Sequence, residues 1–89
     1  MDATAFEAEL SKNGFVQIET KAIEPRPANE AHAHDYIVRG LVLDGIFIVA
    51  ENGKPKTYYA GDIFQVAQGT PHTEEIGAGG AKVLVGRKY

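Results

Sequence analysis

Turn-forming residues recur at close intervals through this 89-residue chain, and they leave room only for short strands between them. Asn or Asp followed by Gly suits the left-handed conformations of tight turns, so Asp44-Gly45 and Asn52-Gly53 each predict a hairpin. Three further boundaries are a strand start at Gly61-Asp62, a break at Gly69-Thr70-Pro71 and a flexible turn at Gly77–Gly80. Short strands with closely spaced turns are typical of an all-β sandwich or barrel, which is the fold class we predict.

The first residues carry a different pattern, which predicts a short N-terminal helix. Asp2 or Thr4 can cap the beginning of this helix, and Gly14 stands where a left-handed residue commonly ends one. Phe6 and Leu10 share one face, and because so short a helix is not stable alone, that face must pack against the rest of the chain. The expected organisation is this helix packed on a single β domain, with the boundaries 1–14 and 15–89.

Composition excludes several classes of function. The formal net charge of −3 argues against general nucleic-acid binding, and Arg87 and Lys88 near the end are interpreted as a solvated terminus. No apolar run approaches the ~20 residues of a membrane span, and no basic leader opens the chain, so a cytoplasmic location is expected by default. The absence of cysteine excludes disulfides, thiolate metal ligands and a cysteine nucleophile.

Two apolar segments do not alternate as the strands of an isolated antiparallel barrel should. Leu41-Val42-Leu43 and Ile46–Ala50 are apolar on both faces, so their outer faces are expected to be covered. The N-terminal helix can cover part of this surface, and a second subunit is the expected cover for the rest. We therefore predict a homodimer.

The placement of the three histidines carries most of the chemical information. His32 and His34 are separated by one residue, so in an extended segment both side chains project from the same face. His72 follows a later turn, and from a neighbouring strand it would complete a facial set of three nitrogens. Zinc, iron, nickel, copper and, less well, manganese accept such a set and keep open positions for a ligand. The sequence thus predicts a divalent transition metal bound by these three histidines.

The histidines lie within a longer pattern that resembles the two-part signature of the cupin superfamily, G(X)5HXH(X)3-4E(X)6G and G(X)5PXG(X)2H(X)3N. The resemblance extends over roughly residues 26–76. Six residues carry it: His32, His34, Gly45, Gly61, Gly69 and His72. It implies a small antiparallel jelly-roll barrel of the cupin 2 type, with the metal held inside the barrel by the matched histidines.

Several positions depart from this signature. Arg26 stands in place of the first glycine, Ala67 in place of the proline and Ile76 in place of the asparagine. The place of the glutamate falls on Val38 or Arg39, and neither side chain can bind a metal. Some cupin dioxygenases use three histidines without the glutamate, so the resemblance still allows metal chemistry here.

Two side chains are the candidate catalytic groups. If alternation continues from His34, Tyr36 and Val38 face inward; Tyr36 could then bind a substrate, or it could simply fill the barrel. Glu74 lies two residues after His72, on the same face of an extended strand. It could support or replace a metal ligand, or it could be a charged residue at the rim.

Other polar positions leave alternatives open. Arg39 interrupts an apolar strand, so it could pair with an acid at a subunit contact or bind an anionic substrate. Tyr58 and Tyr59 occupy opposite faces of one strand, and the sequence does not indicate which of them faces inward.

The resemblance implies two kinds of function. The first is a metal-dependent enzyme, such as a dioxygenase, isomerase or lyase, acting on a small organic substrate. The alternative is a non-catalytic module that binds or senses a small molecule, and the lost motif residues favour it. Fold alone does not choose between these functions.

Overall fold

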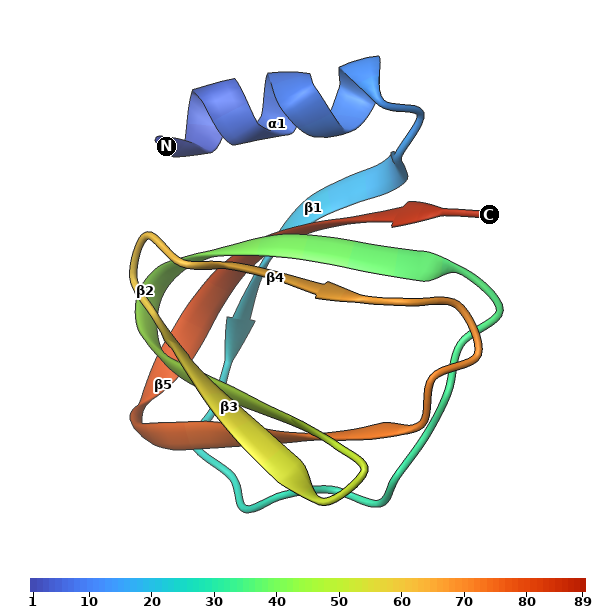
Figure 1. Cartoon of the computed structure of the whole chain (residues 1–89). Helices are drawn as coiled ribbons and strands as arrows, with labels where there is room; N and C mark the ends of the chain where they lie inside the picture. The colour runs from blue at the N-terminus through green and yellow to red at the C-terminus, as the bar shows by residue number, and fades with distance from the viewer.

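The computed structural model describes residues 1–89 and contains one helix followed by five strands. The elements in chain order are α1 (Ala3–Lys12), β1 (Val16–Ile23), β2 (Ile37–Glu51), β3 (Lys54–Tyr59), β4 (Ile63–Val66) and β5 (His72–Lys88). All strand pairs are antiparallel, and the sheet order is β1-β5-β2-β3, with β4 also paired to β2. The sheet bends round into a barrel whose edges are not joined to one another (Figure 1). The predicted fold, a small antiparallel jelly-roll barrel with a short N-terminal helix, is therefore confirmed, although the sheet does not close.

The barrel is built on two long strands rather than on many short ones. β2 and β5 contain 15 and 17 residues, and they pair from Ile37 with Lys88 to Glu51 with His72. The hairpin predicted at Asp44-Gly45 is wrong, because both residues lie inside β2 where its register against β5 shifts. The flexible turn predicted at Gly77–Gly80 is also wrong, since that run lies inside β5.

Both turn predictions are wrong because a glycine in the left-handed conformation occurs in β-bulges as well as in turns. Gly45 has φ +81° and Gly80 has φ +78°, and the two lie close together where β2 and β5 bend. A Cβ at Gly45 would collide with the carbonyl oxygen of Gly80. Bulges increase local bending and twist, so the paired glycines form the corner at which the sheet folds over.

The remaining turn predictions are confirmed. Asn52 and Gly53 have φ values of +53° and +72° and form the tight turn between β2 and β3. The break at Gly69-Thr70-Pro71 separates β4 from β5. This second turn places the start of β5 beside the segment that carries His32 and His34.

Two clusters of apolar side chains stabilise the fold. The larger one fills the barrel and contains Val42, Phe47, Val49, Phe64, Val66, Ile76, Ala81 and Val83. The smaller one lies between α1 and the outer face of the sheet and contains Phe6, Leu10, Phe15, Leu41 and Leu84. Phe6 and Leu10 are fully buried there, as the helix pattern predicts.

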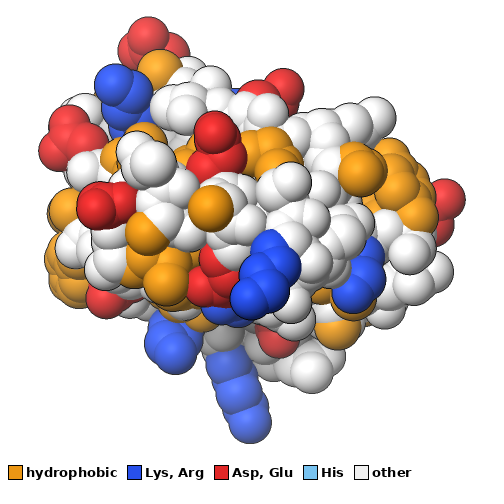
Figure 2. Space-filling view, turned by 90° about the horizontal axis from the view of Figure 1, so that it is seen from above, with side chains coloured by type: hydrophobic (Ala, Val, Ile, Leu, Met, Phe, Trp, Pro, Cys, Tyr) orange, Lys and Arg blue, Asp and Glu red, His pale blue; other side chains and the backbone are white.

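The helix begins and ends at the predicted residues. The Asp2 carboxylate accepts a hydrogen bond from the Ala5 amide at 2.8 Å, which identifies Asp2 rather than Thr4 as the cap. Gly14 follows the helix with φ +83°. Seen from the α1 side, the surface mixes small groups of charged and apolar side chains, and no histidine is visible (Figure 2). α1 is too short and too polar to cross a membrane.

The helix accounts for only part of the non-alternating apolar sequence. It covers Leu41, whereas Ile46 on the same strand remains 37% exposed. The register partner of Ile46 is Tyr59, which is 56% exposed, and Tyr58 packs against the core with its ring 5.8 Å from that of Phe64. Tyr58 is therefore the inward-facing tyrosine of the pair.

Candidate metal centre

Two backbone contacts bring the histidines together. The amides and carbonyls of His32 and His72 exchange two hydrogen bonds of 2.9 Å, which form an isolated bridge between the loop after β1 and the start of β5. The His34 carbonyl accepts a 2.8 Å hydrogen bond from the Gly69 amide. The segment around His32 and His34 is extended but is not a regular strand, and the turn before β5 fixes its position.

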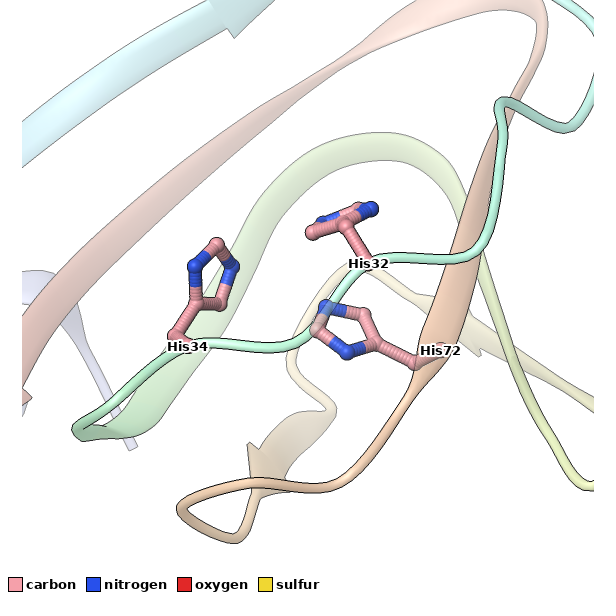
Figure 3. A group of neighbouring side chains, drawn as sticks. All are labelled: His32, His34 and His72. Atoms are coloured by element: carbon pink, nitrogen blue, oxygen red, sulfur yellow. The ribbon is translucent and has the colours of Figure 1, made fainter.

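The three imidazole rings lie against one another (Figure 3). The ring centroids are separated by 4.3 Å for His32 and His72, by 5.0 Å for His32 and His34, and by 5.3 Å for His34 and His72. One nitrogen from each ring lies within 4.8 Å of the other two. The structure thus unites the three residues that the sequence predicts as metal ligands.

Hydrogen bonds to the backbone define the direction of two of the rings. His32 Nδ1 lies 3.1 Å from the Glu30 carbonyl oxygen, and His72 Nδ1 lies 3.0 Å from the Thr70 carbonyl oxygen. A carbonyl oxygen only accepts, so each Nδ1 carries the proton and donates it. In the neutral form of each ring, Nε2 then keeps a free lone pair, which is the state that a metal ligand requires.

The surroundings of His34 favour its neutral form. Burial, and after it the nearby rings of His32 and His72, lower the pKa of His34 from its ordinary value of 6.5. His72 is only 2% exposed, while His32 and His34 are half-buried. Neutral imidazoles with free nitrogens near neutral pH are the form that binds divalent metals.

A cavity of about 180 Å³ extends from the histidines into the barrel. His32, His34 and Tyr36 line one part of it, and apolar side chains such as Phe47 and Phe64 line another. A space next to the His32 and His34 rings, with a mainly apolar wall, can accept a small molecule while limiting the access of water.

Tyr36 and Val38 face inward, as alternation from His34 predicts. The Tyr36 ring stacks on the His34 ring with a centroid distance of 4.8 Å and an interplanar angle of 13°. Both Tyr36 and Val38 line the cavity. Tyr36 therefore holds the His34 ring in position and also presents its own edge to the cavity.

Glu74 also lies at the site, on the same side as His72. Its Oε2 atom is 3.5 Å from His72 Nε2, and its Oε1 atom accepts a 3.3 Å contact from the Arg26 guanidinium. The Glu74 amide donates a 2.8 Å hydrogen bond to the Asn29 side chain. A carboxylate is thus held beside the free nitrogen of His72, although it comes from a different strand than the cupin signature specifies.

The signature position of the glutamate supplies no carboxylate. Val38 lines the cavity, whereas Arg39 points to the outer face and contacts the Glu9 carboxylate at 2.8 Å and the Gln65 side chain at 3.0 Å. Arg39 therefore pairs with an acid, as one of the alternatives from the sequence proposed. The acid belongs to α1 of the same chain rather than to a subunit contact.

Sequence reasoning missed three charged groups and one amide at the site. The charged Arg26 and the neutral Asn29 hold Glu74 from the loop after β1, and the charged Arg87 and Lys21 line the cavity. Lys88 is exposed, as the interpretation of a solvated terminus predicts, whereas Arg87 is half-buried in β5 opposite Val38 and also lines the cavity. The missed signal is alternation along β5, in which Val83, Val85 and Arg87 all line the cavity.

No family model matches the sequence, and the search of curated proteins finds no match. Solved structures do match. A cupin 2 conserved barrel domain protein from Salinispora arenicola is 14% identical, with a TM-score of 0.70, over 81% of this chain and 61% of that one. A cupin-2 domain containing protein from Shewanella frigidimarina is 17% identical, with a TM-score of 0.72, over 94% of this chain and 92% of that one.

A third match is the polyketide cyclase RemF from Streptomyces resistomycificus, which is 20% identical, with a TM-score of 0.67, over 84% of this chain and 55% of that one. The chain spans less than two thirds of the length of several of these proteins, including the Salinispora protein at 61%. Sequence identities in this range establish the fold alone. The sequence resemblance and the structural matches agree, and the chain has the fold of the cupin superfamily.

Proposed function

We propose that this protein is a small metal-binding cupin that holds one divalent transition metal through the Nε2 atoms of His32, His34 and His72. The observation that carries the proposal is the convergence of three ring nitrogens within 4.8 Å of one another. The backbone carbonyls of Glu30 and Thr70 support it, because they orient two of the rings with Nε2 free.

The donor set fits a late divalent metal. Three neutral imidazoles suit zinc, iron, nickel, copper and, less well, manganese, and the chain has no thiolate to compete with them. The Glu74 carboxylate beside His72 can approach the ion or stabilise its charge. When bound, the metal supplies a Lewis acid with open positions for an oxygen- or nitrogen-bearing ligand.

The ligand would bind in the adjacent cavity. The first candidate function is an enzyme that converts a small organic molecule by a dioxygenase, isomerase or lyase reaction. The match to a polyketide cyclase supports an enzyme, because that cyclase has a barrel of the same fold. Tyr36 and Glu74 are the candidate catalytic side chains, since both line the cavity beside the histidines.

The second candidate function is a non-catalytic module that binds or senses a small molecule. The specific observation in its favour is that the signature glutamate position holds Val38, an apolar side chain at the cavity wall. Oxygen uptake and product analysis with a panel of thiols, diketones and hydroxy acids separate the two candidates. Turnover supports the enzyme, and saturable binding without turnover supports the module.

Metal binding itself is tested by calorimetric titration of untagged protein with Zn²⁺ and Ni²⁺. We expect about one equivalent to bind and His34→Ala to lose at least ~10²-fold in affinity, because a lost ligand costs more than a lost supporting contact. Gln68→Ala, an exposed change in the turn near the site, is the matched control and should bind like the parent. Metal binding that is unchanged in His34→Ala would contradict the proposal.

The homodimer is proposed from the exposed pair on the outer face of the barrel. Ile46 and Tyr59 are register partners, and the helix leaves both of them partly exposed. A second copy that packs on this pair would bury the apolar side chains of β2 that α1 leaves exposed. A monomeric mass by light scattering at micromolar concentration would count against it. The cytoplasmic location stays an expectation from the sequence.

A further inference from the structure

Arg87 is the one arginine of the chain that has no carboxylate partner. Arg26 contacts Glu74 and Arg39 contacts Glu9, each within 4.0 Å, and Arg87 contacts no acid within that distance. Its guanidinium lies over the Tyr36 ring, with Cζ 4.6 Å from the ring centroid. Arg87 makes a side-chain hydrogen bond with Tyr89, and because a guanidinium has five N–H donors, further donors remain for another group while the aromatic face supports the charge.

The direction of Arg87 connects it to the metal centre. Arg87, Tyr36 and His34 form a continuous stack, because the Tyr36 ring contacts the guanidinium and, at 4.8 Å, the His34 ring. All three side chains line the same cavity. A ligand that reaches from the histidines along the Tyr36 ring therefore arrives at the Arg87 guanidinium.

The charge of the cavity favours an anion. Its lining holds two cationic side chains, Lys21 and Arg87, and one anionic side chain, Glu74. Lys21 has Glu19 at 3.4 Å, and Glu74 already has Arg26. Three neutral imidazoles leave the charge of a bound divalent ion uncompensated. Even without a metal, the one charged side chain of the lining that lacks an opposite charge is the Arg87 guanidinium, in a chain whose formal net charge is −3.

The rest of the lining limits the ligand to a small molecule with an apolar body. The volume of about 180 Å³ lies below the ~300–1,000 Å³ of ordinary ligand pockets. Phe47, Phe64, Val83 and Val85 supply most of the wall away from the histidines. Such a wall suits a short hydrocarbon chain and offers no hydrogen bonds to a sugar or a nucleotide.

We propose that the cavity selects a small organic carboxylate, whose carboxylate group is bound by the Arg87 guanidinium over the Tyr36 ring while its other end reaches the histidines. This inference rests on the proposed function, because it names the ligand class of the same site. Arg87 is a specificity-determining residue in this account: its planar fork matches the two oxygens of a carboxylate, and a neutral isostere leaves it unpaired.

The test compares butanoate with butanamide, an uncharged molecule of nearly the same shape. Each is titrated into the full-length protein, both metal-free and loaded with Zn²⁺, and the dissociation constant is obtained from amide chemical shifts. The variants are Arg87→Gln and Lys88→Gln, which remove the same charge from neighbouring residues. Lys88 is the matched control because it projects over Phe15, on the helix side of β5.

We expect butanoate to bind the parent at least about tenfold more tightly than butanamide, as a charge-assisted hydrogen bond should allow. This preference should disappear in Arg87→Gln, persist in Lys88→Gln and be partly restored in Arg87→Lys. Equal binding of the two molecules by the parent, or a preference that survives Arg87→Gln, would overturn the inference. If Arg87→Gln does not fold, a preference that is reduced but still present in Arg87→Lys, which keeps the charge but not the fork, supports the inference, and an undiminished preference overturns it.

The metal-free titration separates this inference from the proposed function. A protein that does not bind Zn²⁺ contradicts the metal site, but an Arg87-dependent carboxylate preference in that protein still supports the ligand class. A protein that binds Zn²⁺ and shows no such preference contradicts the ligand class alone.

Discussion

Arg39 and Arg87 lie on paired strands, in adjacent register positions, and yet they face opposite sides of the sheet. On the helix side, Arg39 is matched by the Glu9 carboxylate and the Gln65 amide, and apolar side chains fill the surroundings. On the cavity side, Arg87 has no carboxylate partner, and His32 lines the cavity with its Nδ1 atom bound to a backbone carbonyl and its Nε2 atom free of such a contact. The arginine on the helix side is therefore paired with a carboxylate, whereas the arginine on the cavity side has none.

The strongest test of the difference between the two sides of the sheet is a substitution that destabilises only the packing between α1 and the sheet. Phe6→Ala removes a fully buried ring between α1 and the sheet, and we expect it to lower the free energy of unfolding by about 3–5 kcal/mol. Chemical denaturation measures this loss. Zn²⁺ affinity at low temperature, where the variant is still folded, should match that of the parent. A large drop in Zn²⁺ affinity would show that the two sides are not independent.

The second prediction concerns the carboxylate beside His72. Glu74→Gln removes a negative charge 3.5 Å from His72 Nε2, so we expect Zn²⁺ affinity to fall about tenfold. The neighbouring Glu75→Gln, which contacts no histidine, should bind Zn²⁺ like the parent and provides the control for net charge. Calorimetric titration of both variants gives the comparison. Equal losses in the two variants would assign the effect to overall charge rather than to the site.

A smaller effect is expected at the ion pair of Arg39. Glu9→Gln leaves Arg39 without its acid, and because both side chains are about one quarter exposed, the loss of stability should be at most about 1 kcal/mol. The carboxylate preference of the cavity should be unchanged, since Arg39 faces away from it. A thermal melt together with the butanoate titration checks both statements.

The smallest effect is the pH dependence of metal-free stability. The pKa of His34 is lower in the folded protein than the ordinary value of 6.5, so the unfolded chain binds this proton more tightly. His34 therefore costs no stability above pH 6.5, and the protein loses stability as the pH falls from there through the lower folded pKa. In His34→Gln this contribution should be absent, which denaturant titrations over the acidic range can detect. A dependence unchanged in His34→Gln would assign it to other groups.

The sequence predicts those features that depend on local patterns. The helix, its Asp2 cap and the Asn52-Gly53 hairpin require only neighbouring residues, and the structure contains all of them. The His32 and His34 pair also follows from alternation in an extended segment. The resemblance to cupins supplies the long-range partner, His72, which no local pattern could place beside them.

The wrong predictions arise where one local sequence pattern is compatible with two different structures. Asp44-Gly45 has the composition of a hairpin turn, but whether Gly45 makes a turn or a bulge depends on Gly80, which is distant in the sequence. Arg87 is adjacent to Lys88 and resembles a charged tail, although the inward face of β5 continues through it. The ion pair that holds Glu74 is likewise set by tertiary contact with Arg26.

X-ray absorption spectroscopy of the Zn²⁺-loaded protein tests the central claim most directly. We predict three imidazole nitrogens at about 2.0–2.1 Å, completed by oxygen ligands, and the loss of one imidazole in His34→Ala. A zinc ion that is surrounded by oxygen atoms only, or whose spectrum is the same in the parent and in His34→Ala, would contradict the account.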